Sequence, residues 1–407
     1  MFEAPPGKTL ANVVHDFWQG VYQHLIQVLT SEGWSPQMVN YQFLFTVPAP
    51  FSSLAIEAFK RIISGTGFAR HGFQVEITEP EAAALYTLRN QPSLRTRPAG
   101  FQTRQSFVVC DAGGGTVYLS SYSITQSTPT IRMEQTGIVT GYRCGSTFID
   151  QNLLLDNFIQ QKEWFNKESY QETINIELPR NGDLYCPVKR GNYLPITRQQ
   201  MLAFFSEPIA KTCQLVVDHV KECKSRNYQI NYVFLVGGFG SSLYLGECLQ
   251  RSLRNIDPNI LVIKPPDAQQ SVVLGCLFTQ LQRLRRDDDP VKVRLCRAHF
   301  GVVCSMPFNP TKHSEHEKYI EPVTGQVLAR GQIMWLIHKG DRISDTTSAD
   351  IERTLIRSFK TTPTMAWTET LVCSTAYRAP LLLGPSVQEV CKMTSDLRSC
   401  GQNEFQK

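Results

Sequence analysis

A glycine-rich turn directly after an apolar run constrains this chain more than any other feature. Residues 107–117 read FVVCDAGGGTV, so a β-type segment leads into Asp111, three glycines and Thr116. Glycines permit positive φ angles and close backbone approach, and successive N–H groups in such a turn form a concave anion site. Asp111 can hold Mg²⁺ directly or through water. The stretch therefore indicates either a phosphate and magnesium loop or an ordinary glycine-rich hairpin turn.

The composition is that of an ordinary globular protein. The chain has 407 residues, of which 42% are hydrophobic and 19% charged, enough for two or three domains. The net charge of +5 is spread without a long basic block, so nucleic-acid binding is not expected. No stretch approaches the roughly 18 apolar residues of a membrane span, and the N-terminus lacks an export pattern. We expect a protein of the cytoplasm or nucleus without a membrane partner.

Cysteine and histidine spacing does not indicate a metal site. The twelve cysteines include no C-x-x-C pair, and most lie in apolar segments, which is typical of small buried side chains in a reducing compartment. His313 and His316 are spaced like metal ligands. Because no predicted helix surrounds them and no third ligand is near, we interpret this segment as a solvated loop.

Periodicity predicts an α/β chain followed by a β-rich region. The polar stretch at 165–197 shows no clear periodicity, so no helix or strand is predicted there. The sequence pattern changes to β-type alternation over 291–379, which places a domain boundary near residue 288. We expect domains at 1–104, 105–288 and 289–407. The predicted strands occupy 42–47, 73–77, 107–111, 119–124, 233–236 and 260–263. Predicted helices with both ends defined occupy 11–29, 197–220 and 272–276. Four further helices are predicted by their starts alone: at Ser52 or Ser53, at Pro80, after Ser146, and after the glycine turn at 237–240.

Four segments, taken in order, resemble motifs of the actin-like ATPase superfamily and, within it, the heat shock protein 70 family. They are EPEAAA at 79–84, similar to the first connecting motif; DAGGGT at 111–116, similar to the second phosphate loop; LVGG at 235–238, similar to the adenosine loop; and Pro266-Asp267 with 272–275, similar to the second connecting helix. Segments 46–49, 335–341 and 394–397 are similar to a divergent branch of the family, typified by human heat-shock 70 member 12 and its fungal relatives.

The resemblance implies a fold, a cofactor and a set of roles. The fold would be the actin-like ATPase (ribonuclease H-like) nucleotide-binding fold without its first strands, binding ATP or ADP with Mg²⁺. Unfolded or extended polypeptides would be the partners of such a chaperone, with its co-chaperones left open. The implied roles are Mg²⁺ binding by Asp111, phosphate binding by Gly113, Gly114, Gly115, Thr116 and Gly145, orientation of a water molecule by Glu79, and contact with the nucleoside by Gly237, Gly238, Phe239, Gly240 and Asp267. Glu79 and Asp267 could instead cap helices, and Gly145 could serve packing alone.

Three departures from the family pattern point to weak or absent ATP hydrolysis. No Asp-Gly-type phosphate loop precedes residue 11, Tyr118 stands where a carboxylate follows the loop threonine, and residues 160–195 do not match the helix that stacks on adenine. Losing part of a preorganised electrostatic clamp costs about 3 to 4 kcal/mol of transition-state stabilisation. We therefore expect an N-terminally truncated or degenerate family member with an exposed sheet edge in its first lobe.

Two other functions stay open from the sequence. The first is a catalytically dead protein-interaction module whose function lies in the β-rich region, which Tyr118 and the missing loop favour. The second is a sugar or acetate kinase on the same fold. A kinase would need a substrate-binding carboxylate in the cleft and a larger first half, and neither is evident.

Overall fold

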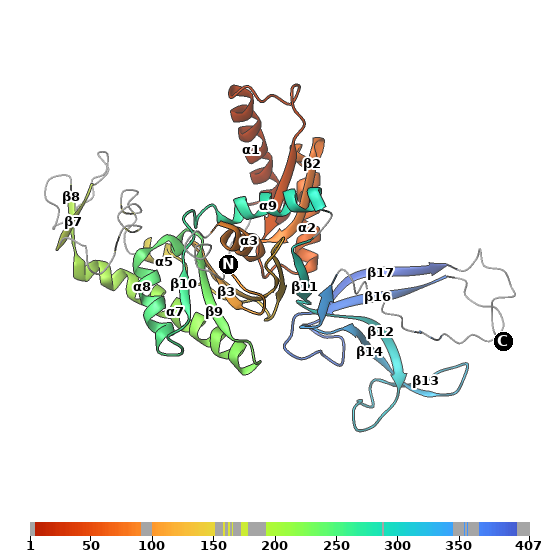
Figure 1. The fold of residues 1–407 in the computed structure, drawn as a ribbon. Helices are drawn as coiled ribbons and strands as arrows, with labels where there is room; N and C mark the ends of the chain where they lie inside the picture. Colours follow the sequence, from red (N-terminus) through yellow and green to blue (C-terminus); the bar gives the residue numbers. More distant parts are fainter. Residues whose placement is uncertain are drawn as a thin grey trace. The chain divides into compact units, whose positions relative to one another are not determined.

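The computed structural model describes residues 5–90, 100–150, 158, 162, 165, 172–177, 193–286, 289–344, 354, 356 and 366–396. The chain separates into two compact units, Met1–Lys292 and Val293–Lys407. The first unit is mixed α/β with a mixed sheet, and the second is built on an antiparallel sheet (Figure 1).

The mixed sheet of the first unit is organised around strand β3. β3 pairs in parallel with β9 on one side and antiparallel with β4 on the other, and β9 pairs in parallel with β10. The hairpin predicted from 107–124 is therefore confirmed. The strands are β3 (Ser106–Ala112), β4 (Val117–Gln126), β5 (Arg132–Gln135), β6 (Thr140–Tyr142), β9 (Ile230–Val236) and β10 (Leu261–Ile263).

Side chains of β3 alternate between two cores, as the period of two in a strand requires. Val108 and Cys110 are fully buried in the core that contains helices α7 (Arg198–Ser225) and α8 (Leu243–Arg254). Phe107 and Val109 are fully buried in the other core, with α3 (Glu79–Asn90) and α9 (Ser271–Arg286). By the same alternation, Asp111 falls on the face that α3 covers.

Helices α3 and α9 pack side by side (Figure 1). Ala82, Ala83 and Ala84 are fully buried, and a Cβ atom on Gly275 would collide with the carbonyl oxygen of Ala82. Small residues on both helices thus let their backbones approach closely. Gly275 serves helix packing.

A second, two-stranded sheet lies in the first unit, where β1 (Gln42–Val47) pairs in parallel with β2 (Gly72–Thr78). Its core is aromatic: Trp18 of α1 (Leu10–Ser31) meets Phe45 edge-to-face at 5.3 Å between ring centroids. Helix α2 (Ser53–Ser64) begins after Ser52, whose hydroxyl accepts a hydrogen bond from the Ala55 N–H at 3.2 Å. The predicted helices and strands of residues 11–77 are confirmed, with ends shifted by one or two residues.

Two segments differ from the sequence prediction. Helix α7 continues past residue 220 to Ser225 because its buried stripe continues to Cys223, and it tolerates Pro208 in its interior. Within 165–197, strands β7 (Thr173–Glu177) and β8 (Tyr193–Thr197) form an antiparallel pair with Ile174, Ile176 and Ile196 buried. Of the helix predicted after Ser146, the structure describes α5 (Thr147–Asp150), and most of its continuation lies outside the described residues.

The β character predicted for 291–379 is confirmed and extends further, to β17. The five-stranded antiparallel sheet has the order β13, β14, β12, β16, β17. Strand β11 pairs antiparallel with β15 outside this five-stranded sheet. No helix in the described parts of the chain combines the length and apolar character needed to cross a membrane. The strands are β11 (Val291–Leu295), β12 (His299–Pro307), β13 (Lys318–Ile320), β14 (Val327–Ile337), β15 (Arg342–Ser344), β16 (Ala366–Ser374) and β17 (Gln388–Asp396).

We predict that the buried His219 makes the stability of the first unit fall in acid. Burial, with a smaller effect from the positive Arg226, lowers the pKa of His219 to about 4, whereas an unfolded histidine titrates near 6.5. The unfolded chain therefore binds a proton first, and stability falls by about 2 kcal/mol between roughly pH 7.5 and 5. Urea unfolding of His219→Gln should show a flatter pH profile over this range. His24→Gln, at an exposed position of α1, should keep the wild-type slope.

Candidate functional site

Adjacent parallel strands bring Asp111 and Gly237 to the same edge of the mixed sheet. In the β3–β9 register Asp111 lies opposite Val236, so Gly237 follows directly beside the Asp111 carboxylate. The next parallel strand, β10, ends at Ile263 and leads to Asp267. The carboxyl ends of parallel strands in open α/β sheets are the usual place for a ligand crevice.

Gly237 has to be glycine at this position. Its φ angle is +85°, and a Cβ atom there would lie 2.5 Å from the carbonyl oxygen of Ala112 and 2.8 Å from Oδ1 of Asp111. Its N–H donates to the carbonyl of Ala268 at 3.1 Å. The absence of a side chain thus lets the end of β9 lie against the Asp111 carboxylate.

The carbonyl groups of the glycine turn point toward the start of α5. The carbonyls of Gly113 and Gly114 accept hydrogen bonds from the N–H groups of Ser146 and Thr147 at 3.1 and 2.8 Å. The Thr147 hydroxyl also donates to Gly114, at 2.8 Å. A Cβ atom on Gly145 would collide with the Gly114 carbonyl oxygen, so Gly145 packs against the turn.

The turn leaves backbone donors available for an anion. Its Gly113 N–H closes the turn by donating to the Thr116 carbonyl at 3.0 Å. The N–H groups of Gly114, Gly115 and Thr116 donate no hydrogen bond to any described residue. Gly114 and Gly115 are exposed to solvent. Such adjacent free donors form an anion-binding concavity.

Two carboxylates repel each other here: Asp111, just before this turn, and Glu79, at the start of α3. Burial raises the pKa of Asp111 to about 6. Burial also raises the pKa of Glu79 to about 7, with a further contribution from the negative charge of Asp111. Neither carboxylate has a hydrogen bond or an ion pair with another described residue. A cation between them would relieve both the burial and the repulsion.

The helix cap at the start of α3 comes from Glu81 and not from Glu79. Oε2 of Glu81 accepts a hydrogen bond from the Thr78 N–H at 3.1 Å, and Glu81 is only 2% exposed. The capping role considered for Glu79 is therefore wrong, and its carboxylate remains available on the site side. The sequence spacing of threonine and glutamate three residues apart could have indicated this cap.

Asp267 accepts a hydrogen bond from the Tyr86 hydroxyl at 2.7 Å. Burial, and then this bond, raise the pKa of Tyr86 to about 12. The alternative of a helix cap at Asp267 is wrong, because α9 begins only at Ser271. Sequence reasoning missed Tyr86, although its distance of seven residues from Glu79 places both on one face of α3.

The turn after β9 differs from the predicted strand, glycine turn and helix N-terminus. A 3₁₀ turn (η2, Phe239–Ser241) intervenes before α8, and the Ser242 hydroxyl accepts the Leu245 N–H at 3.3 Å. Because the Leu245 N–H donates to this cap, it is not available to bind an anion at the start of α8. The Phe239 side chain and Gly240 are buried, so Gly238 is the exposed residue at this turn.

Tyr118 lies opposite Asp111 across the β3–β4 hairpin. A Cβ atom on Gly141 of β6 would collide with the Tyr118 ring, which therefore packs closely over that glycine. Thr116, two residues earlier, is half-buried. This strand thus contributes an aromatic side chain where a carboxylate could have held metal.

Comparison with known proteins concerns the second unit. A family profile described as a domain of unknown function (DUF8568) matches residues 294–406. A search of curated proteins gave no match to the chain.

We predict that Gly237→Ala destabilises the first unit by about 2 kcal/mol or more, because the new Cβ atom meets the Ala112 carbonyl and the positive φ angle adds strain. Gly238→Ala is the matched control. Gly238 has a helical φ of −62° and nothing within 4 Å of a Cβ atom, so its substitution should change stability by less than about 0.5 kcal/mol. Urea unfolding measures both variants, and equal effects would contradict the described contact.

We predict that Asp111→Asn stabilises the metal-free protein at alkaline pH. Because the pKa of Asp111 is raised in the folded state, its ionised form opposes folding. The free energy of unfolding of the wild type therefore falls as the carboxyl ionises, from about pH 4 through pH 6. The amide avoids that cost, and the gain should be about 2 kcal/mol near pH 8 and vanish near pH 4. Thermal unfolding with a metal chelator measures this. Asp218→Asn, at an exposed position of α7, should show no such pH-dependent gain.

Proposed function

We propose that the first unit binds Mg·ATP or Mg·ADP, and that the protein is an ATP-binding, chaperone-like member of the heat shock protein 70 family with weak or absent ATP hydrolysis. The observation that carries this proposal is the placement of two partly buried, mutually repelling carboxylates, one of them just before a glycine turn with free N–H groups. The four motifs in order support the assignment to the family.

The residues present fit such a ligand. Mg²⁺ is commonly held by one or two carboxylates, with phosphate oxygens and water completing its shell. Asp111 and Glu79 supply the two carboxylates. Among the described residues, no group of three or more His, Cys, Asp or Glu side chains is placed so that it could hold a metal by itself. The free N–H groups of Gly114, Gly115 and Thr116 suit the phosphates. Gly238 and the Tyr86–Asp267 pair would border the nucleoside.

Weak hydrolysis follows from what surrounds Glu79. With a pKa raised to about 7, Glu79 can accept a proton near neutral pH, which suits a weak general base. The neighbouring strand offers Tyr118 where a further carboxylate could have helped to hold metal. Bound Mg²⁺ would supply charge neutralisation at the phosphates. The described residues offer few further groups to stabilise the transition state.

A second candidate is a protein-interaction module that binds no nucleotide. Tyr118 beside Asp111, and the Ser242 cap that uses an N–H group of α8, favour this candidate. Its partner would be an extended polypeptide bound by the second unit. Polypeptide binding by the wild-type chain that shows no response to nucleotide, and that Asp111→Ala retains, would support this candidate over the first.

Isothermal titration of the full chain with Mg·ATP and Mg·ADP tests the proposal. We expect saturable binding, and Asp111→Ala should raise the Kd by at least about tenfold because it removes the carboxylate that would hold Mg²⁺. Asp218→Ala, which removes an exposed carboxylate on α7, should bind like wild type. Absence of heat and of saturation in the wild-type protein would reject nucleotide binding.

A further inference from the structure

A strap, residues 375–383, runs from the end of β16 to the edge of β14 in the second unit. Leu382 forms an antiparallel bridge with Gln332 of β14, and the Ile333 N–H donates to the Leu381 carbonyl at 3.3 Å. Strand β12 pairs along the other edge of β14, and β13 pairs with an earlier part of β14. The strap therefore covers a part of this edge that no other described strand covers.

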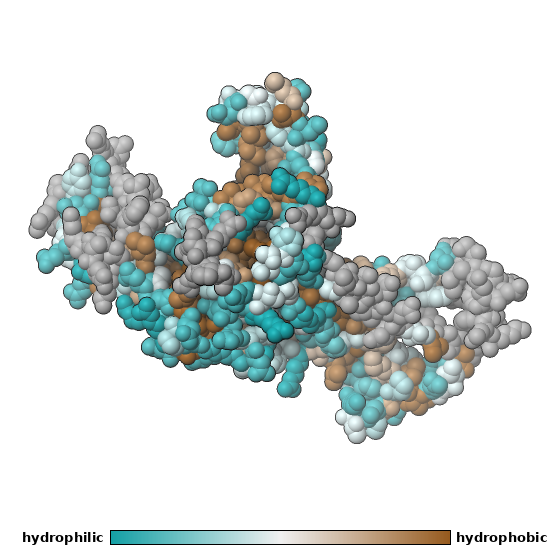
Figure 2. All heavy atoms as spheres, in the orientation of Figure 1, coloured by the Kyte–Doolittle hydropathy of each residue, from teal (hydrophilic) through white to brown (hydrophobic). Residues whose placement is uncertain are grey.

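Little apolar burial holds the strap in place. Leu381 and Leu383 are 69% and 52% exposed, and Tyr377 is 92% exposed. Figure 2 shows apolar residues at the surface of the second unit. Because exposed side chains contribute little hydrophobic stabilisation, the attachment of the strap depends on its hydrogen bonds.

Three side chains outside the strap donate hydrogen bonds to its backbone carbonyl groups. The pairs are His299 to Ala376 at 3.2 Å, Lys339 to Thr375 at 2.9 Å, and Trp335 to Pro380 at 2.7 Å. A lysine ammonium and a tryptophan indole remain donors between pH 8 and 5. Of the three donors, the imidazole is the group that changes its protonation state in this range.

The contacts of His299 require one neutral tautomer. Its Nδ1 accepts a hydrogen bond from the backbone N–H of Lys339 at 3.0 Å, so Nδ1 has no proton. The carbonyl of Ala376 can only accept, so the proton is on Nε2. A second proton would make Nδ1 a donor that faces another donor. Protonation of His299 therefore breaks its bond to the turn after β14.

The surroundings of His299 also oppose its protonation. The side chain is 4% exposed, and burial is the main cause that lowers its pKa, whereas the hydrogen bond to the strap raises it. The turn after β14 contributes the positive charges of protonated His338 and of Lys339, which lower this pKa, and the negative charge of Asp341, which raises it. Trp335 of β14, whose ring centroid lies 5.6 Å from that of His299, has no charge.

We propose that His299 is an acid-sensitive latch for the strap. In its neutral form the imidazole joins β12, the turn after β14 and the strap. When the ring binds a proton, it loses the bond to the turn and leaves its buried position for water, because an unpaired charge is costly to bury. The strap is then released, and residues 331–333 of β14 become an open strand edge. All these residues belong to the second unit, so the latch does not depend on nucleotide binding.

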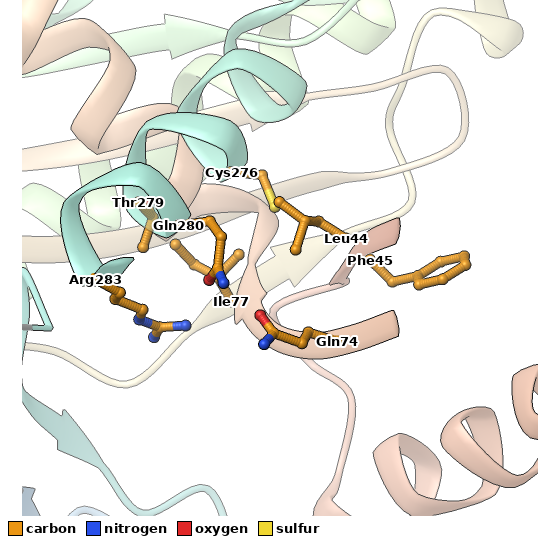
Figure 3. Close-up of a pocket in the computed structure, with 8 residues that line it drawn as sticks. All are labelled: Leu44, Phe45, Gln74, Ile77, Cys276, Thr279, Gln280 and Arg283. Carbon is orange, nitrogen blue, oxygen red and sulfur yellow. The ribbon is translucent and has the colours of Figure 1, made fainter. Parts of the chain in front are cut away.

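The pocket between α9 and the two-stranded sheet of the first unit has no such latch (Figure 3). Its lining includes Leu44, Ile77 and Cys276, and its cation, Arg283, forms an ion pair with Asp289 at 2.8 Å. None of the described residues that line it is a histidine. Arginine keeps its charge from pH 8 to 5. We therefore expect acid to act on the strap and not on this pocket.

Hydrogen exchange of the full chain from pH 8 to 5 tests the latch, with each rate divided by the intrinsic rate of an unfolded amide at the same pH. Because burial lowers the pKa of His299 in the closed state, the open state binds a proton more readily, and opening is favoured below about pH 6.5. The Ile333 N–H donates to the strap, and the Leu383 N–H donates to the Gly331 carbonyl at 3.5 Å. Protection of these two amides should fall at least about threefold between pH 7.5 and 5, while amides of β12 keep theirs.

Three variants assign the effect to one group. His299→Gln removes the titrating ring and should abolish the pH dependence. His338→Gln changes an exposed histidine whose ring centroid lies 5.5 Å from that of His299, and it should keep the wild-type slope. Lys339→Met removes the bond to Thr375, so it should lower the protection at every pH and keep the slope.

Nitrogen NMR of histidine-labelled wild-type protein provides a readout that needs no variant. We expect His299 to be the Nε2–H tautomer at pH 7.5, and this result with the wild-type exchange profile decides the question even where His299→Gln does not fold. Protection that is independent of pH in the wild type, or an Nδ1–H tautomer, would overturn the proposal. A slope that persists in His299→Gln, or one that His338→Gln abolishes, would overturn it as well.

Discussion

The site depends on the close contact between Gly237 and the end of β3. Parallel pairing with β9 places this residue beside Asp111, and the missing side chain leaves room for the carboxylate, whose Oδ1 would lie 2.8 Å from a Cβ atom. The same pairing fixes which face of β3 each residue occupies. Asp111 therefore points to the face covered by α3, where Glu79 begins the helix.

Burial gives these carboxylates an energetic cost in the absence of a cation. Burial raises the pKa of both carboxyl groups, and the negative charge of Asp111 raises the pKa of Glu79 further. A folded protein can contain two repelling carboxylates when the surrounding packing outweighs their repulsion, and such pairs occur most often at functional sites. Here the packing is supplied by the fully buried alanines of α3 and by the close approach of Gly275.

Helix α9 packs against α3, the helix that begins at Glu79. The other side of α9 carries exposed apolar side chains from Val273 to Leu284. Two surfaces of different chemistry therefore belong to one closely packed pair of helices. In the second unit, the matched domain of unknown function coincides with a separate antiparallel sheet.

The sequence by itself determined the local elements and the chemistry of single residues. A short apolar run identified β3, helical spacing identified α1, α2 and the start of α7, and the run of three glycines after Asp111 indicated a turn. Only the tertiary structure decided which distant groups meet: Gly237 with Asp111, Tyr86 with Asp267, and the carbonyls of the turn with Ser146 and Thr147. It also decided that Glu81 caps α3 and that Ser242 caps α8. The reason is physical: periodicity depends on neighbours along the chain, whereas pairing register, burial and competition for hydrogen bonds depend on segments that are far apart in sequence.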